Sequence, residues 1–538
     1  MERTAEIHRS VRLKPDIVPS ELAGAFTMDL KDWSWIGDWT GRRALLTPTR
    51  EAIVDNILNK RYTFKDMDNR ANQVARILLD SGVQKGDRVG IYSKNRFDFL
   101  DILFACGKIG AIVTPFNIRL TAREIEYLLK KTDPSMIFYD PDLHNQFGEL
   151  RPQLDKNHLV VMGEKKIEGD SDLKSLMNNK ASSAVERPSI TMDDPYLIVF
   201  TGGTTGLPKG AILSHGLVFW NSVNTITSWG LRPDDIQPLL FPLFHTGGIN
   251  VLLIPFYHLG ALSIIMGDFN SEETLRVIEQ EKCTIVVGVP TMFNMISQSQ
   301  GFEKTSFDSV RVFISGGAPC PVAIMEKYWD RGKILKMGYG LTEVGPNNFH
   351  LPDDSVKERP TSVGFPAFHC DMKIVEDDNK IVEEGEAGEL LLRGPHTFSG
   401  YWEEPEETAK VIEPDGWVHT GDLVTKDKDG FYYIVGRKKD IFISGGENIF
   451  PTEIEEILFK HPKISEAAVI GVPDEKWGEV GKAFIVLRNG ESMTEDEVRK
   501  CFDGKLARYK IPKYYEFRDD LPKSAAGKIL KRDLEDES

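Results

Sequence analysis

The sequence contains few cysteines, and no two of them form a C-x-x-C pair. Five occur among 538 residues. Disulfide frameworks and cysteine-based zinc sites require numerous or closely spaced cysteines. We therefore expect neither kind of site. The same composition indicates a reducing compartment, and we expect a cytoplasmic protein.

Positive charge is scarce relative to negative charge. The chain has 66 Lys and Arg against 82 Asp and Glu, which gives a formal net charge of -16 and a pI of 5.3. Proteins that bind nucleic acids normally present a basic face, so we expect no nucleic-acid partner. The composition is otherwise that of a soluble globular protein, and the length predicts roughly two to four domains or subdomains.

Long apolar runs are also missing. The most apolar stretch, residues 249–267, is interrupted by Pro255, His258 and Gly260. A membrane-spanning helix needs about 20 consecutive apolar residues, so two buried elements joined by a turn fit this stretch better. Residues 1–16 lack the apolar core of a secretory signal. We expect no transmembrane segment.

Short apolar segments alternate with amphipathic stretches, such as 64–81 and 272–280, through most of the chain. This alternation predicts an α/β protein with mostly parallel strands. The expected strands are residues 88–93, 111–116, 134–140, 159–163, 196–200, 284–290 and 311–317.

The pattern changes in the last third of the chain. Residues 372–394 and 429–442 carry Gly and Asp between apolar segments, which predicts hairpins. A helix that begins near Pro451 and further strands within 465–487 follow. We therefore expect a large N-terminal domain and a small α+β C-terminal domain, with the bounds 1–436 and 437–538.

The ten residues TGGTTGLPKG, 201–210, have the composition of a phosphate-binding loop. A glycine-rich loop that leaves a strand can direct several backbone N–H groups at one anion. The order of residues differs from the P-loop pattern G-x-x-x-x-G-K-[ST], and Pro208 opposes immediate entry into a helix. We expect a flexible arm over phosphates, with a plain Gly/Thr turn as the alternative.

The segment GYGLTE places an aromatic ring, a hydroxyl and a carboxylate close together. Tyr339 could stack on a base, Thr342 could bond a phosphate oxygen, and Glu343 could hold Mg²⁺. A turn with a surface glutamate is the alternative.

Three further polar residues suit a nucleotide site. Asp422 ends an apolar run in WVHTGDL, a position that suits ribose hydroxyls. Arg437 of GRKKD is a second ribose or phosphate candidate, and Lys528 of PKSAAGK follows a turn of small residues. Taken singly, each has an ordinary alternative, namely a turn residue, a solvated charged loop and a surface lysine.

Together and in this order, TGGTTGLPKG, YGLTE, TGD, GRKKD and PKSAAGK resemble the adenylate-forming superfamily of acyl-CoA synthetases, carrier-protein adenylation domains and beetle luciferases. The resemblance covers nearly the whole chain. It implies an α/β fold with a large multi-layered N-terminal domain of parallel-rich sheets, a β-barrel-like subdomain, and a small mobile α+β C-terminal domain. It also implies that Mg²⁺ and ATP convert a carboxylic acid into an acyl-adenylate and pyrophosphate, after which coenzyme A takes the acyl group.

The resemblance implies a role for each nucleotide-binding residue. The loop that closes on the phosphates comprises Thr201, Gly202, Gly203, Thr204, Thr205 and Lys209. Gly202 stands where many relatives have Ser, so one hydroxyl contact is missing. The adenine slot is lined by Gly316, Gly317, Ala318, Gly338 and Tyr339. Thr342 would contact the α-phosphate, Glu343 would hold Mg²⁺, and the ribose ligands would be Asp422 and Arg437.

The C-terminal domain supplies the remaining groups. Lys528 would bridge the attacking carboxylate and the α-phosphate, and so neutralise the repulsion between two anions. Lys439 matches the hinge position about which the small domain turns after adenylation. Gly445 and Gly446 would then border coenzyme A, because glycine permits close approach to the backbone.

His245, in PLFHTGGIN, matches a histidine that gates the acyl channel, with a core histidine as the alternative. The other expected pocket residues are Thr246, Gly247, Gly248, Ile249, Met292, Gly316 and Gly338. None carries a charge, which favours an apolar monocarboxylate. We expect a medium- or long-chain fatty acid, with a coumarate- or benzoate-like aromatic acid as the alternative. The sequence does not decide whether a carrier protein replaces coenzyme A as the acyl acceptor. It also does not decide whether the protein is a homodimer.

Overall fold

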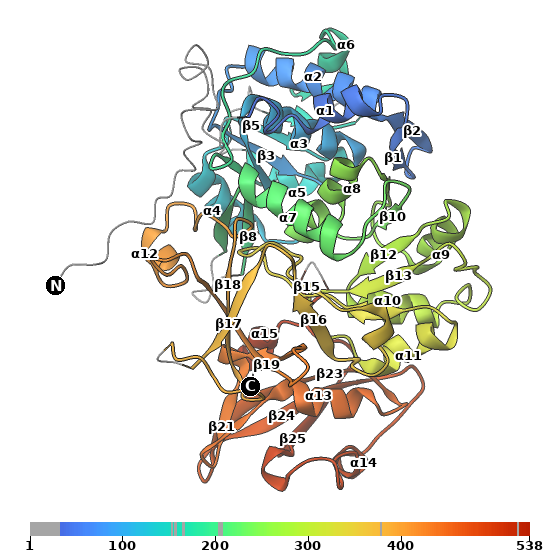
Figure 1. Ribbon diagram of the computed structural model, residues 1–538, viewed down its shortest axis with the longest axis vertical. Helices are drawn as coiled ribbons and strands as arrows, with labels where there is room; N and C mark the ends of the chain where they lie inside the picture. Colours follow the sequence, from blue (N-terminus) through green and yellow to red (C-terminus); the bar gives the residue numbers. More distant parts are fainter. Residues whose placement is uncertain are drawn as a thin grey trace, which may run out of the picture.

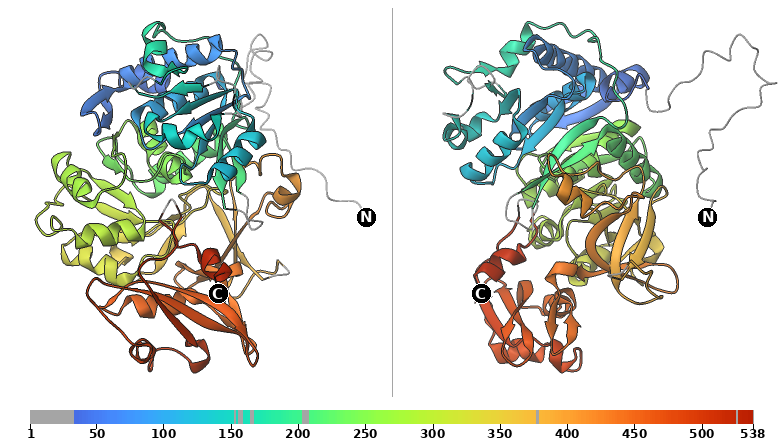
Figure 2. Two further views of the ribbon diagram at one scale, coloured as in Figure 1. Left: turned by 180° about the vertical axis from the view of Figure 1, so that it is seen from behind. Right: turned by 90° about the vertical axis from the view of Figure 1, so that its left-hand side faces the viewer.

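The computed structural model describes residues 33–151, 154, 159–163, 167–202, 208–376, 379–524 and 527–537. Three residues of the expected phosphate loop, Gly203, Thr204 and Thr205, lie outside this set. The chain runs from sheets at one end of the molecule to a small C-terminal domain at the other end (Figure 1). The two views in Figure 2 show the same order of parts.

The first large sheet has the strand order β7-β6-β5-β3-β4-β8-β9. Neighbouring strands are parallel except β8 and β9, which form an antiparallel pair. The strands are β3 (Arg88–Tyr92), β4 (Ile112–Phe116), β5 (Met136–Tyr139), β6 (Leu159–Val161), β7 (Ser171–Asp172), β8 (Pro195–Thr201) and β9 (Lys209–Ser214). All five strands expected in this part of the chain are confirmed.

Several helices of the same part of the chain begin with polar caps. Thr63 and Asp66 form a capping box at the start of α2, and Thr121 and Glu124 form another at α4. Such boxes satisfy N–H groups that have no partner within the helix. The helices are α1 (Trp39–Leu46), α2 (Phe64–Asp80), α3 (Phe97–Ile109), α4 (Ala122–Thr132), α5 (His144–Gly148), α6 (Leu173–Asn178) and α7 (His215–Ser228).

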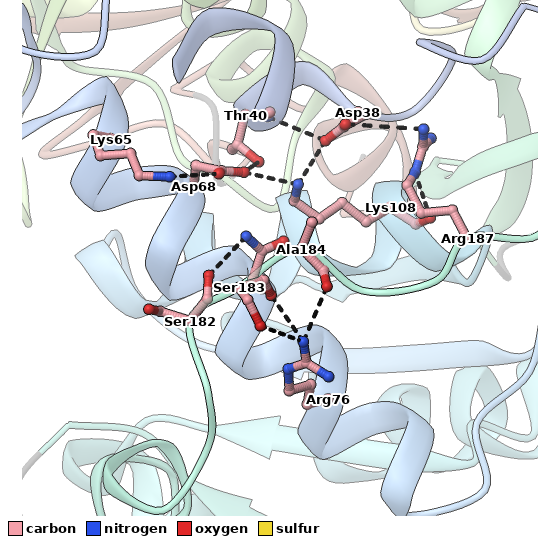
Figure 3. Close-up of polar contacts among 12 residues, drawn as sticks. Asp38, Thr40, Lys65, Asp68, Arg76, Lys108, Ser182, Ser183, Ala184 and Arg187 are labelled. Atoms are coloured by element: carbon pink, nitrogen blue, oxygen red, sulfur yellow. Dashed lines mark hydrogen bonds and ion pairs between the residues drawn. The ribbon is translucent and has the colours of Figure 1, made fainter. Parts of the chain in front are cut away.

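A buried ionic cluster joins α1, α2 and α3 (Figure 3). Lys108 Nζ donates to Asp38 Oδ1 at 2.6 Å and to Asp68 Oδ1 at 2.8 Å, and its side chain is only 3% exposed. Arg187 approaches the same Asp38 carboxylate. A buried ammonium is tolerated only when it is paired in this way, so the cluster specifies how these helices pack.

Two smaller sheets follow, with the orders β10-β11-β1-β2 and β12-β13-β14. The second is parallel throughout. The strands are β1 (Glu51–Asp55), β2 (Lys60–Thr63), β10 (Ile236–Leu239), β11 (Leu262–Ile265), β12 (Ile285–Gly288), β13 (Val312–Ser315) and β14 (Leu335–Met337). The helices are η5 (Gly247–Val251), a π-helix, with α8 (Leu253–Leu259), α9 (Ser271–Gln280), α10 (Pro290–Gln298) and α11 (Val322–Asp330). The strands expected at 284–290 and 311–317 are therefore confirmed.

The apolar stretch 249–267 folds as the end of η5, helix α8 and strand β11. Gly260 makes the turn between α8 and β11 with a φ of 87°. The prediction of buried elements joined by a turn is thus correct. Among the described residues, no helix is both long enough and apolar enough to cross a membrane.

An antiparallel sheet of order β15-β16-β20-β19-β18-β17 precedes the C-terminal domain and corresponds to the expected β-barrel-like subdomain. Its strands are β15 (Phe349–His350), β16 (Ser362–Pro366), β17 (Asp371–Val375), β18 (Gly388–Arg393), β19 (Val418–Lys426) and β20 (Tyr432–Arg437), with α12 (Pro405–Ala409) between β18 and β19. The hairpin β17–β18 confirms the one predicted at 372–394. The second hairpin, β19–β20, begins earlier than predicted: β19 ends before residue 429, and within 429–442 only β20 is a complete strand.

The C-terminal domain has its own sheet, β22-β21-β24-β23, with β25 paired to β24. A separate buried core lies under this sheet. The elements are β21 (Phe442–Ser444), β22 (Glu447–Ile449), α13 (Pro451–Phe459), β23 (Ile464–Asp474), β24 (Gly478–Leu487), α14 (Glu495–Lys500), β25 (Tyr514–Arg518) and α15 (Lys531–Asp536). The boundary between 436 and 437 stays a prediction; β20 ends there and a 3-10 turn, η7 (Lys438–Asp440), follows.

Candidate active site

The glycine-rich loop joins β8 to β9, and Thr201 pairs with Lys209 across this hairpin. A strand, not a helix, therefore follows Pro208, as expected. Gly210 allows close packing, because a Cβ at this position would lie 2.7 Å from Ile198 Cγ2. The Gly210 carbonyl accepts a hydrogen bond from the Trp402 N–H at 2.7 Å.

Glu343 lies in the loop between β14 and β15 and faces the base of this hairpin. Its Oε1 accepts hydrogen bonds from Thr201 Oγ1 at 3.2 Å and from the Tyr401 hydroxyl at 3.1 Å. Lys209 Nζ lies 5.3 Å from the centre of the Tyr401 ring and forms an ion pair with Glu407. Three of the residues expected at the phosphates and the metal, Thr201, Lys209 and Glu343, are thus gathered around Tyr401.

Tyr401 and Glu407 were missed by sequence reasoning. They come from the segment after β18, which the sequence marks only by an aromatic pair and a run of acidic residues. Tyr401 reaches the site because it bridges to Ala211 on β9. The hydrogen bond from Lys209 to Glu407 lowers the pKa of that carboxyl to about 2, so the pair is ionic at neutral pH.

A second cluster forms where β19 and β20 pair. Asp422 and Arg437 are directly opposite each other in the antiparallel register, and Arg437 Nε lies 3.2 Å from Asp422 Oδ1. The Tyr339 hydroxyl donates to Asp422 Oδ2 at 2.7 Å. Burial and the charge of Asp422 raise the pKa of Tyr339 well above its ordinary value, so the phenol stays protonated. The three residues expected at the nucleoside are therefore in contact.

The residues expected at the adenine slot lie at one edge of the parallel sheet. Gly316, Gly317 and Ala318 follow β13, and Gly338 follows β14. The Gly338 N–H donates to the Ser315 carbonyl at 2.8 Å. The carboxyl ends of parallel strands meet at the same edge of a sheet. The residues that follow β13 and β14 are therefore neighbours, although they are about twenty positions apart in sequence. Tyr339 is the residue after Gly338.

Lys528 approaches the nucleoside cluster from the C-terminal domain. Its ammonium interacts electrostatically with Arg437, Asp422, Asp440 and Lys439. Desolvation, and after it the positive charge of Arg437, lowers the pKa of Lys528 from 10.5 to about 8.

The loop that carries Lys528 lies against the large domain. A Cβ at Gly527 would lie 2.9 Å from Thr291 Oγ1 and 3.2 Å from Val289 Cγ2 at the start of α10. The structure therefore places the loop of Lys528 against the start of α10.

His245 lies in the turn before η5. Desolvation lowers its pKa to about 4, so the ring is neutral at physiological pH. Its Nε2 is buried and has no hydrogen-bond partner. Gly248 and Ile249 are buried in η5, while Met292 lies on α10.

A cavity of about 430 Å³ is lined by Trp229 and Ile314 together with charged residues such as Arg311, Lys336 and Asp353. Its walls do not include the residues expected to form the acyl pocket, so the composition of that pocket stays a prediction.

The expected coenzyme A residues stand apart from these clusters. Gly445 and Gly446 are exposed at the turn between β21 and β22, and a Cβ at Gly445 would lie 2.9 Å from Trp477 Cε3 of the same domain. Strand β21 lies near the lower end of the molecule in Figure 1. Lys439 lies in η7, between the two domains.

Comparison with known proteins places this constellation in a family. The model for AMP-binding enzymes matches residues 41–402, and the model for the C-terminal domain of AMP-binding enzymes matches residues 453–528. The chain belongs to the AMP-binding enzyme family.

Individual relatives of this AMP-binding enzyme match it almost end to end. A feruloyl-CoA synthase of Amycolatopsis sp is 36% identical over 501 residues, 93% of this chain and 98% of the relative. An indoleacetate–CoA ligase of Aromatoleum aromaticum is 35% identical over 499 residues, 93% and 97% of the two chains. The crystal structure of an anthranilate CoA ligase in complex with anthranoyl-AMP superposes with a TM-score of 0.86 at 28% identity, over 93% of this chain and 96% of the other.

The protein is therefore an AMP-forming acid–CoA ligase, with ATP, a small carboxylic acid and coenzyme A as its substrates. The expected fatty acid, and a role in lipid metabolism, receive no support from these relatives.

Magnesium is typical of this family, and the residues present fit it. Among the described residues, no group of three or more His, Cys, Asp and Glu side chains could hold a metal alone. Glu343 and Thr201 present adjacent oxygens, and Mg²⁺ is commonly held by one or two carboxylates together with substrate phosphates.

Proposed function

We propose that this enzyme activates an aromatic carboxylic acid. The acid attacks the α-phosphate of ATP, which gives an aryl- or arylalkyl-adenylate and pyrophosphate. The thiolate of coenzyme A then displaces AMP and takes the acyl group. The alternative drawn from the sequence, an aromatic acid, fits the relatives named above better than a fatty acid does.

The observation that carries the reaction class is the convergence of Lys528 with Asp422 and Arg437 across the domain boundary. Two anions, the carboxylate and the α-phosphate, must approach each other for attack. An ammonium between them offsets the repulsion. One preorganised donor of this kind contributes about 3–4 kcal/mol to the rate of the step.

The other residues of the site hold ATP in our proposal. Asp422 and Arg437 bind the ribose, Tyr339 stacks on adenine, and Thr342 bonds the α-phosphate. Lys209 exchanges its partner Glu407 for the β- and γ-phosphates. Mg²⁺ on Glu343 would neutralise phosphate charge. Lys439 acts as the hinge, and Gly445 and Gly446 border coenzyme A after the small domain turns.

The test measures AMP release with a panel of acids, in the presence and absence of coenzyme A. The panel contains hydroxycinnamates, benzoates, indole-3-acetate, and fatty acids of 6 to 16 carbons. We expect turnover with aromatic acids only when coenzyme A is present. The Lys528→Ala enzyme is the background control, with an expected loss of roughly 10²–10³-fold.

Two other outcomes would contradict the proposed substrate or the proposed acyl acceptor. Turnover of fatty acids alone would contradict the aromatic proposal. Acid-dependent pyrophosphate release without turnover by coenzyme A would favour a carrier protein as the acceptor.

A further inference from the structure

The lysine that is expected to bind phosphates already has an anionic partner in the structure. Lys209 Nζ forms an ion pair with one carboxylate oxygen of Glu407 on helix α12, and Lys410 binds the other oxygen of the same carboxylate. The side chains of Lys209 and Glu407 are only 13% and 25% exposed. A phosphate that binds this lysine must therefore displace Glu407.

The main chain that leads to α12 is attached to the strand that carries Lys209. This strand, β9, is the last of its sheet, and the segment before α12 pairs with its free edge. The Ile212 N–H donates to the Gly400 carbonyl at 2.9 Å. The Trp402 N–H donates to the Gly210 carbonyl at 2.7 Å. The two partners of the ion pair thus belong to one hydrogen-bonded unit.

Side chains also fix the start of α12. The Tyr401 N–H donates to Thr408 Oγ1 at 2.8 Å. Glu404, which precedes the helix, forms an ion pair with Lys131 of α4, the helix that lies beside α12 in Figures 1 and 2. The Trp402 indole N–H donates to the Lys131 carbonyl at 3.2 Å. Helix α12 is therefore braced on two sides, independently of its contact with the phosphate-loop lysine.

Negative charge is concentrated around this lysine. Lys209 lies over the Tyr401 ring. Burial, and after it the charges of Glu343 and of two glutamates in the α12 segment, raise the pKa of the Tyr401 hydroxyl. In the proposed function Mg²⁺ neutralises Glu343. Glu407 is left as an anion that competes with phosphate oxygens for the ammonium of Lys209.

Such a competitor acts on ATP and on pyrophosphate alike, because both present the β- and γ-phosphates to the same lysine. Binding energy that the substrate and the transition state share does not raise the rate of the chemical step. The same binding energy slows the departure of pyrophosphate. Product release limits turnover in many enzymes, so a carboxylate that recaptures the lysine is an advantage.

We propose that Glu407 is a positioning residue that acts through Lys209: it competes with the β- and γ-phosphates for the ammonium and thereby speeds the release of pyrophosphate. The lysine alternates between a fixed carboxylate and an exchangeable phosphate. The inference rests on the assignment of Lys209 to the phosphates in the proposed function. It does not depend on which acid the enzyme activates.

The test measures ligand binding to the full-length enzyme by calorimetry, without any acid, so that no reaction occurs. The ligands are pyrophosphate, ATP and AMP, each with Mg²⁺. The variant is Glu407→Gln, which removes the charge and keeps the shape of the side chain. We expect Kd for pyrophosphate and for ATP to fall about two- to fivefold, the range for a partly exposed ion pair. The dissociation rate constant of pyrophosphate, measured by stopped flow, should fall by a similar factor.

AMP is the internal control, because it lacks the β- and γ-phosphates, and its Kd should not change. General damage to the site would instead alter all three Kd values together. Glu404→Gln is the matched control variant, since Glu404 belongs to the same segment and is 20% exposed, but its ion-pair partner is Lys131. We expect Glu404→Gln to leave all three Kd values unchanged.

Weaker binding of ATP and pyrophosphate by Glu407→Gln, with AMP unchanged, would make Glu407 a supporting residue of the phosphate site and would overturn the inference. Unchanged affinities for all three ligands would overturn it as well. Lys209→Ala tests the premise: unchanged affinity for ATP and pyrophosphate in that variant would remove the phosphate assignment of Lys209, and this inference with it. The aromatic-acid proposal is decided separately, by the panel of acids.

Discussion

At the scale of single residues, the proposed role of Lys528 and its surroundings have opposite effects on its charge. In our proposal the reaction needs its positive charge, whereas desolvation and the neighbouring charge of Arg437 lower its pKa to about 8. A lysine with this pKa is mostly charged at neutral pH, but it loses its proton within the range in which the protein can be assayed.

The adenylation step is therefore expected to fail at alkaline pH. Below pH 8 Lys528 is protonated and active; above pH 8 each further pH unit removes about nine tenths of the remaining charged form, so kcat/KM for ATP falls about tenfold per unit. The measurement is the pH profile of ATP–pyrophosphate exchange. Bound ATP, being anionic, raises this pKa, so the profile of kcat breaks at a higher pH.

Lys528→Arg supplies the control, because a guanidinium stays charged over the whole range. Its residual exchange activity should show no break near pH 8. The same alkaline break in the arginine variant would assign it to another group.

At the scale of elements, the turn before η5 positions His245 by close backbone packing. The His245 N–H donates to the Pro242 carbonyl at 3.1 Å, and the Gly248 N–H donates to the His245 carbonyl at 3.0 Å. A Cβ at Gly248 would lie 2.3 Å from the Pro242 oxygen. Backbone atoms cannot rotate away, so only glycine fits here.

Gly248→Ala should therefore displace the turn and weaken binding of the acid. Overpacking of this kind costs about 1–3 kcal/mol, which is roughly a 5- to 150-fold rise in KM for the acid with little change in KM for ATP. Gly247→Ala is the matched control, since its Cβ would meet the Phe241 ring at an ordinary 3.4 Å. Equal effects of the two substitutions would contradict the packing argument.

At the scale of the whole molecule, our proposal assigns the two half-reactions to different faces of the C-terminal domain. Lys528 is at the site, with Gly527 packed against α10, whereas Gly445 and Gly446 are exposed at a turn of the same domain. A rotation about the segment that follows β20 would exchange the two faces. Lys439, in the short 3-10 turn η7, is the proposed pivot.

Lys439→Pro should separate the half-reactions. Proline restricts its own φ to about -65°, a value that a 3-10 turn also has, and so opposes a large backbone rotation at this residue. We expect normal ATP–pyrophosphate exchange and a loss of acyl-CoA formation. Lys438→Ala, one residue earlier, should retain both ATP–pyrophosphate exchange and acyl-CoA formation. An unimpaired overall rate in Lys439→Pro would contradict the proposal that Lys439 is the hinge.

Much of this architecture follows from local sequence. The apolar segments became strands because buried β-strands need little beyond short runs of β-branched and aromatic residues, and the position of Pro208 correctly predicted that no helix begins at Lys209. The motif residues Glu343, Asp422, Arg437 and Lys528 were identified by residue type and order. Tyr401 and Glu407 were not, because their approach to Lys209 depends on a bridge between Tyr401 and Ala211.

The sequence by itself determined the chemical groups, their order and the α/β class, since composition and periodicity act over a few residues at a time. Only the tertiary structure decided which groups meet. Asp422 faces Arg437 because of one strand register, and Lys528 arrives from a separate domain. Such contacts join residues that are far apart in the sequence, and no local sequence pattern specifies them.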